Sequence, residues 1–83
     1  MKNQKIKLIW DFKGEDSEQI AQHHTIHIDE FAKKENVDLI SSGVESINSN
    51  HHIAFLIVNE SEMIIVRDAL IPHRGEYFEN HHT

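Results

Sequence analysis

The first part of the chain alternates apolar and polar residues and then changes to a helical period. Residues 5–12 place an apolar side chain at every second position, namely Ile6, Leu8, Trp10 and Phe12. This alternation predicts a strand with one buried face. From Asp16 or Ser17 to about Asn36, apolar residues recur every three or four positions, which is typical of an amphipathic helix. Its inward stripe comprises Ile20, Ala21, His24, Ile28, Phe31 and Ala32.

Two more extended segments and a second helix follow. Residues 38–47 have a weak apolar pattern, in which Gly43 is expected to mark a bulge. Residues 52–58 are apolar on both faces, and such a strand needs cover on both sides. A second helix is predicted from Asn59 or Ser61 up to Gly75, followed by a short strand at 76–79. The face of this helix that we expect to be buried carries Met63, Val66, Ala69, Leu70 and His73.

The order β-α-β-β-α, with a final β, predicts one α+β domain over residues 1–83, of which 80–83 are expected to form a flexible tail. It resembles the ferredoxin-like arrangement, in which both helices cover one face of an antiparallel sheet. With the two-faced segment 52–58, it also resembles the dimeric α+β barrel superfamily, which includes YciI-like and monooxygenase-like proteins. The resemblance covers nearly the whole chain but rests on element order and polarity, without a specific motif. It implies a homodimer through the other sheet face and a pocket between sheet and helices, but no particular activity.

Charge and composition limit the classes of molecule that the protein is expected to bind and where it is expected to occur. The formal net charge is −6 with neutral histidines, and no basic stripe is present, which argues against nucleic-acid binding. No apolar run approaches the roughly 20 residues of a membrane span, and the run after the basic start is too short for a signal peptide. Since the chain also has no cysteine, we expect a soluble, cytoplasmic protein.

Eight histidines make imidazole the main candidate for metal chemistry. His23 and His27 are one helical turn apart, a usual spacing for two metal ligands. His24 and His73 are expected to face the sheet from the two helices, and His52 begins the strand between them. These five histidines are the predicted ligands, and Zn, Cu or Ni would suit them. The alternative is that His23 and His27 are solvated, while His24 is hydrogen-bonded and partly buried.

A pocket for a small acidic ligand is the second candidate site. Arg67 and Arg74 are expected on one side of the second helix, and with His73 they suit a carboxylate or phosphate. Trp10 and His24 are expected to line the same pocket. The alternative is a helix C-terminus whose cationic side chains suit the helix dipole.

Three functions are compatible with the sequence. The leading hypothesis is that a histidine cluster between sheet and helices binds a small ligand or a divalent transition metal. The first alternative is a small enzyme of the monooxygenase-like or YciI-like kind. In that enzyme His24 or His73, oriented by Asp11 or Asp68, would act as a general acid or base. The second alternative is a structural or regulatory dimer without chemistry.

Overall fold

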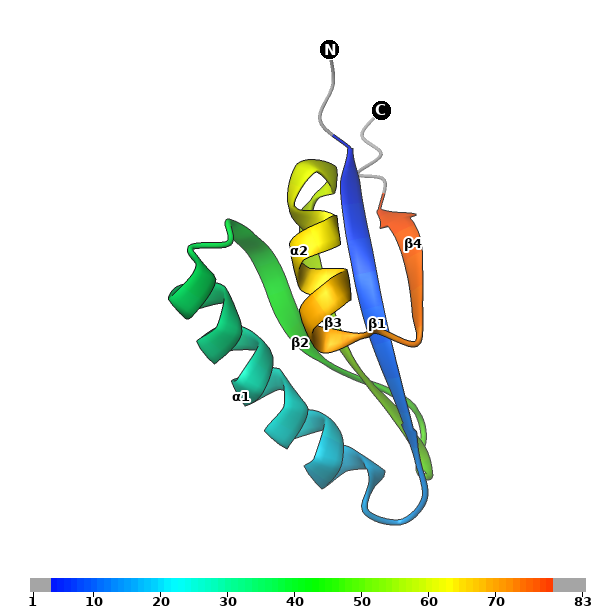
Figure 1. Ribbon diagram of the computed structural model, residues 1–83. Coiled ribbons are helices and arrows are strands. Elements are labelled where there is room, and N and C mark those ends of the chain that lie inside the picture. Colours follow the sequence, from blue (N-terminus) through cyan, green and yellow to red (C-terminus); the bar gives the residue numbers. More distant parts are fainter. Residues whose placement is uncertain (1–3, 79–83) are drawn as a thin grey trace.

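The computed structural model describes residues 4–78 and has the α+β architecture expected from the sequence (Figure 1). The elements are β1 (Lys5–Lys13), α1 (Ser17–Glu35), β2 (Leu39–Asn48), β3 (His51–Asn59), α2 (Glu60–Leu70) and β4 (Arg74–Phe78). The four strands form one antiparallel sheet, and the arrangement is compatible with a ferredoxin-like fold. The flexible tail predicted at 80–83 lies outside the described residues.

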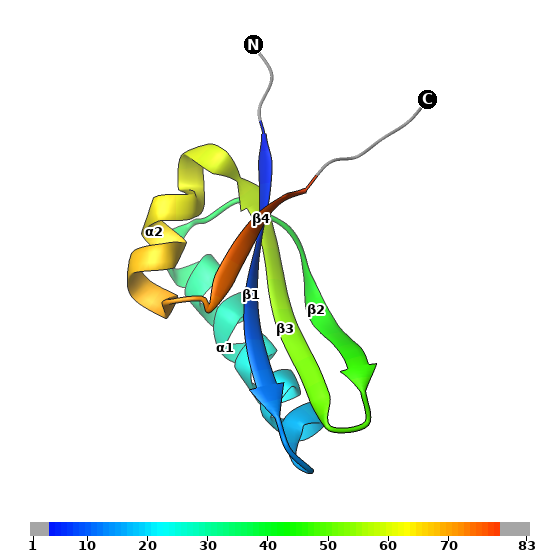
Figure 2. The same cartoon turned by 90° about the vertical axis from the view of Figure 1, so that its right-hand side faces the viewer.

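Both helices cover the same face of the sheet, whose strand order is β2-β3-β1-β4 (Figure 2). The apolar alternation in β1 determines which residues face the helices. Ile6, Leu8 and Trp10 belong to the core, and in the register they lie opposite Val58, Leu56 and Ala54 of β3. Ala21, Ile28 and Ala32 of α1 and Val66 of α2 complete this core from the helix side. The alternation therefore predicted the buried face of β1 correctly.

The buried stripe of α1 differs from the prediction at its first residue. Ile20 was expected to face the sheet, but 47% of its surface is exposed. The fully buried stripe instead passes through Ser17, Ala21, Ile28 and Ala32. Ile20 lies about 100° around the helix from Ala21, on the flank of this stripe. The small side chains of the stripe bring α1 close to the sheet and leave Ile20 in solvent.

Helix α2 ends five residues before the predicted end at Gly75. Ile71 adopts a left-handed conformation with φ of 48°, and its N–H donates to the Arg67 carbonyl over 3.0 Å. A residue before proline disfavours the helical conformation, so Pro72 explains this end. His73 consequently lies in a loop rather than on α2, and its N–H donates to the Ile9 carbonyl over 2.9 Å. This hydrogen bond holds the loop next to β1, immediately before β4 begins to pair with that strand.

Strand β2 has two irregularities, and neither lies at Gly43, where a bulge was predicted. The register with β3 shifts between Leu39 and Ser41 and again between Ser46 and Asn48. Gly43 instead lies opposite Phe55, and a Cβ atom there would be 3.2 Å from the Phe55 ring. The glycine makes room for this aromatic ring, which is a packing role rather than a turn.

The sheet face away from the helices carries a second apolar group, made of Ile9, Ile53, Phe55 and Ile57. Ile9, Ile53 and Ile57 are only 2–5% exposed within the single chain. The Lys7 ammonium lies 4.8 Å from the centre of the Phe55 ring and 3.2 Å from the Glu45 carboxylate. Long polar side chains of the same sheet therefore cover this face, which we call the outer face. The cover that the two-faced β3 sequence requires is present in one chain, and the homodimer stays a prediction.

No helix among residues 4–78 is long and apolar enough to cross a membrane.

Candidate functional site

The predicted metal-ligating histidines fall into three separate places. His23 and His27 are exposed side chains on α1, and their Nε2 atoms lie 3.0 Å apart. The ring centres are 4.6 Å apart and the rings are nearly perpendicular, at 80°. The Nδ1 atom of His27 faces the Glu30 carboxylate at 3.6 Å. The one-turn spacing therefore predicted correctly that these two rings lie next to each other.

His24 points toward the sheet, as its helical phase predicted, and is held by aromatic rings. Its ring centre lies 4.9 Å from that of Trp10 and 5.5 Å from that of Phe12. Its Nε2 atom is buried and has no hydrogen-bond partner among the described residues. Burial lowers the pKa of His24, and the nearby charges of His27, His73 and His23 lower it further. This environment favours a neutral imidazole.

His73 also packs near Phe12, with 6.2 Å between the ring centres. Its Nδ1 atom accepts a hydrogen bond from the Asp11 backbone N–H over 2.7 Å. This bond occupies one ring nitrogen and comes from the main chain rather than from a carboxylate. The carboxylate partner expected for a catalytic His24 or His73 is therefore absent among residues 4–78.

The two adjacent histidines at the start of β3 face opposite sides of the sheet. His52 is buried on the helix side, where its Nδ1 atom lies 2.7 Å from the Ser17 hydroxyl. His51 is on the outer face and donates from Nε2 to the Asp11 carboxylate over 2.9 Å. Arg74 also binds Asp11, over 3.0 and 3.1 Å. Its hydrogen bond is the largest influence that lowers the Asp11 pKa to about 2, with His51 adding to it.

The five predicted metal ligands therefore do not form one cluster. Within the part of the chain that the structure describes, no three or more histidine, aspartate or glutamate side chains are placed to hold one metal ion together. Of the five histidines, His23 and His27 are the pair whose ring nitrogens lie 3.0 Å apart. His52 is bound to Ser17 and His24 is held against Trp10 and Phe12.

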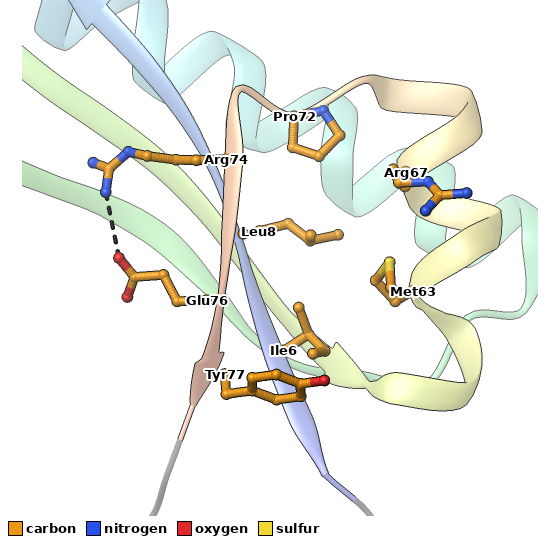
Figure 3. A pocket seen from close by; sticks show the side chains of 9 residues that line it. Ile6, Leu8, Met63, Arg67, Pro72, Arg74, Glu76 and Tyr77 are labelled. Atoms are coloured by element: carbon orange, nitrogen blue, oxygen red, sulfur yellow. Dashed lines mark hydrogen bonds and ion pairs between the residues drawn. The ribbon is translucent and has the colours of Figure 1, made fainter.

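A cleft of about 380 Å³ lies between α2, β1 and β4 (Figure 3). Its volume falls in the range of about 300–1,000 Å³ that is usual for small-molecule sites. The residues that line it are Ile6, Leu8, Met63, Arg67, Pro72, Arg74, Gly75, Glu76 and Tyr77. Gly75 lies opposite Leu8 in the register of β1 and β4, and a Cβ atom there would be 3.2 Å from Leu8 Cδ2. The missing side chain keeps the cleft open above Leu8.

The two arginines predicted to bind an acidic ligand both line this cleft, but they differ in what they contact. The Arg74 guanidinium is engaged by Asp11 and by Glu76, the latter over 3.3 Å (Figure 3). Among residues 4–78, Arg67 makes one side-chain hydrogen bond, from Nε to Asp68 over 3.3 Å. Its side chain is 54% exposed. Arg67 is therefore the cation that remains available to a ligand.

The other three predicted ligand-binding residues do not line the cleft. Trp10 is 2% exposed, and its indole N–H donates to the Leu70 carbonyl over 2.9 Å. Its role is to fix the end of α2 on the sheet. His24 and His73 lie around Phe12 instead. Tyr77, which the sequence also suggested as a pocket residue, does line the cleft. Sequence reasoning missed Met63 and Gly75 as cleft residues, and Gly75 was interpreted as the end of a helix.

Comparison with known proteins adds no relative: no protein-family model, curated protein sequence or solved structure matches this chain.

Proposed function

We propose that this domain binds a small carboxylate with a short apolar body in the cleft between α2 and β4. The observation that carries the proposal is an open apolar cleft with an available guanidinium at its rim. Ile6 and Leu8 form the floor, while Met63 and Pro72 form the wall on the α2 side. These side chains favour the apolar part of a ligand, because its transfer from water contributes roughly 25 cal/mol per Å² of buried apolar surface.

The polar part of the ligand is defined by Arg67. A guanidinium binds a carboxylate through two parallel hydrogen bonds, which makes it more selective for this group than an ammonium would be. The contact of Arg67 with Asp68 joins two side chains that are 54% and 67% exposed. Exposed pairs of this kind contribute little, typically about 0–1 kcal/mol. A ligand carboxylate therefore competes with Asp68 at low cost.

The remaining rim residues limit the size and charge of the ligand. Arg67 is the guanidinium that can meet the ligand's negative charge, because the Arg74 guanidinium and the Glu76 carboxylate bind each other on the side of β4 away from the cleft (Figure 3). The Tyr77 hydroxyl donates to Glu60 over 3.3 Å and is thereby turned toward α2. We therefore propose a monocarboxylate rather than a dicarboxylate or a phosphate.

Binding can be tested with hexanoate, with 1-hexanol as a probe of equal chain length without charge. We expect hexanoate to shift the amide signals of Ile6, Leu8, Met63 and Gly75 in a two-dimensional NMR titration. The Arg67→Gln variant should bind hexanoate about fivefold more weakly, because the charge-assisted hydrogen bonds are lost, while its affinity for 1-hexanol stays the same.

Lys34→Gln is the matched control, since it removes one positive charge from an exposed position on α1. It should leave hexanoate affinity within about twofold of the parent value, because Lys34 does not line the cleft and salt screens exposed charges. Equal losses in both variants would show a nonspecific charge effect and overturn the proposal. Signal shifts that avoid the cleft residues would do the same.

The two alternative functions suggested by the sequence, a small enzyme and a structural or regulatory dimer, remain predictions. Among the described residues, the histidine that donates to a carboxylate within hydrogen-bond distance is His51, which is on the outer face and not in the cleft. The geometry thus favours binding over acid–base chemistry at this site.

A further inference from the structure

We infer that His23 and His27 chelate one Cu²⁺ or Ni²⁺ ion on the exposed face of α1, at a site separate from the carboxylate cleft. Both side chains come from the same helix, one turn apart, so the helical backbone already holds the two rings near each other. Their Nε2 atoms face each other at 3.0 Å. The ion replaces the hydrogen bond between these two nitrogens, and the proton held there moves to Nδ1 of the same ring or to solvent, so that both Nε2 lone pairs bind the ion.

The distance between these nitrogens is close to that of two neighbouring ligands on one metal ion. Histidine nitrogens bind divalent metals at about 2.0–2.1 Å. Two such bonds to nitrogens that are 3.0 Å apart enclose an angle of roughly 95°. This value matches neighbouring positions in square-planar or tetragonal coordination, whereas tetrahedral coordination requires about 109°. Cu²⁺ and Ni²⁺ prefer the former geometry, and imidazole sites generally bind Cu²⁺ more tightly than Zn²⁺, so we infer Cu²⁺ or Ni²⁺.

Glu30 orients one of the two ligands. Its carboxylate lies 3.6 Å from Nδ1 of His27, on the side of the ring opposite the metal-binding nitrogen. A carboxylate in this position favours a proton on Nδ1 and so keeps the lone pair on Nε2. Metal-bound histidines commonly have such a partner. The chain also carries a formal net charge of −6, which favours the approach of a cation.

The neighbouring histidines do not complete this site. His24 turns inward against Trp10 and Phe12, and its Nε2 atom is buried. Among residues 4–78, no third histidine or carboxylate joins a pair to form a larger metal-binding group. Two protein nitrogens therefore hold the ion, and water or an external ligand fills its other positions. Such a site is exchangeable and open to solvent rather than structural.

Copper titration with a set of histidine variants tests this inference. In isothermal titration calorimetry at pH 7.5, we expect the His23→Asn, His27→Asn and double variants each to bind Cu²⁺ at least tenfold more weakly than the parent. Each single variant should lose nearly as much as the double variant, because either change destroys the chelate. Zn²⁺ should bind the parent at least tenfold more weakly than Cu²⁺.

Two controls separate this site from the other histidines. His24→Phe changes an adjacent residue of the same helix, and His81→Asn/His82→Asn removes a histidine pair outside the described residues. Both should keep the parent's Cu²⁺ affinity within about twofold. In the parent, paramagnetic broadening by Cu²⁺ should centre on the amide signals of residues 23–27.

The inference is overturned if the His23→Asn/His27→Asn variant keeps the parent's affinity, or if either control loses affinity as strongly as that variant. Broadening centred elsewhere would also overturn it. None of these results bears on hexanoate binding, because the two α1 histidines do not line the cleft.

Discussion

His24 is the residue at which burial and hydrogen bonding conflict most clearly. Its position on the helix requires an inward side chain, and Trp10 and Phe12 pack on its ring. Its Nε2 atom nevertheless has no hydrogen-bond partner among residues 4–78. A buried polar atom in this state typically costs about 1–3 kcal/mol. An aromatic hydrocarbon ring would fit the same contacts without that cost.

Replacement of His24 by phenylalanine should therefore stabilise the protein at pH 7.5, by about 1 kcal/mol. The gain should grow at lower pH. The folded-state pKa of His24 is lowered, mainly by burial, so the unfolded chain takes up the proton first as pH falls. Stability from the neutral ring is present above about pH 6.5 and is lost as pH falls toward the folded-state pKa.

Urea denaturation of the parent and the His24→Phe variant at pH 7.5 and pH 5 measures this effect. The difference in free energy of unfolding between the two proteins should be larger at pH 5. His23→Gln serves as the control, because it removes an exposed histidine of the same helix. His23→Gln should change the pH dependence of the free energy of unfolding much less than His24→Phe does. If the stability of the His24→Phe protein depended on pH as that of the parent does, a lowered His24 pKa in the folded protein would be ruled out.

At the scale of elements, sequence patterns correctly predicted features that depend on residues close together in the chain. Alternation placed β1 correctly, and the one-turn spacing placed His23 beside His27. The end of α2 was wrong because the effect of Pro72 on the preceding residue was given too little weight against the apolar period. The cleft was not predictable in the same way. It depends on Gly75 of β4 lying next to Leu8 of β1, a pairing between residues far apart in the sequence.

Asp11 links three of the four strands, and this link has a pH dependence of its own. Its carboxylate accepts hydrogen bonds from Arg74 of β4 and His51 of β3. The Asp11 pKa is lowered from 3.8 to about 2, chiefly by the Arg74 hydrogen bond. A lowered acid pKa stabilises the fold fully above about pH 4, and the stabilisation is lost as pH falls through about 2.

Asp11→Asn should lower the free energy of unfolding by about 1–2 kcal/mol at pH 7, because the Asp11 side chain is only 20% exposed. The difference from the parent should be slightly smaller at pH 4 and fall to roughly a third by pH 2.5, as measured by urea denaturation. The matched control is Asp68→Asn, which breaks the exposed contact with Arg67. Its effect should stay within about 0.5 kcal/mol at every pH. Equal effects of both variants would show that Asp11 contributes no more than an exposed ion pair does.

For the whole molecule, the main structural question is how a thin domain with helices on one face protects the other. The extents of 43 × 35 × 16 Å show that the layer is thin. The apolar residues of the outer face are nevertheless buried within one chain. Lys7 covers the Phe55 ring and contacts Glu45, while Arg74 and His51 converge on Asp11. The apolar stems of these long side chains lie on the sheet, while their charged ends stay in water. They therefore shield the apolar residues of the outer face and leave a polar surface.

Removal of these covering side chains should strengthen the association of the protein with itself. Lys7→Ser/Glu45→Ser leaves the net charge unchanged but uncovers Phe55 and Ile57, so we expect the self-association constant to rise at least fivefold. Sedimentation equilibrium of parent and variant between about 5 and 500 µM measures it. Arg67→Ser/Asp68→Ser removes an ion pair on α2 without uncovering this face and should change association less than twofold. Weaker association in the Lys7→Ser/Glu45→Ser protein would instead show that this ion pair holds the predicted homodimer together. The pair would then be part of the interface rather than a cover against it.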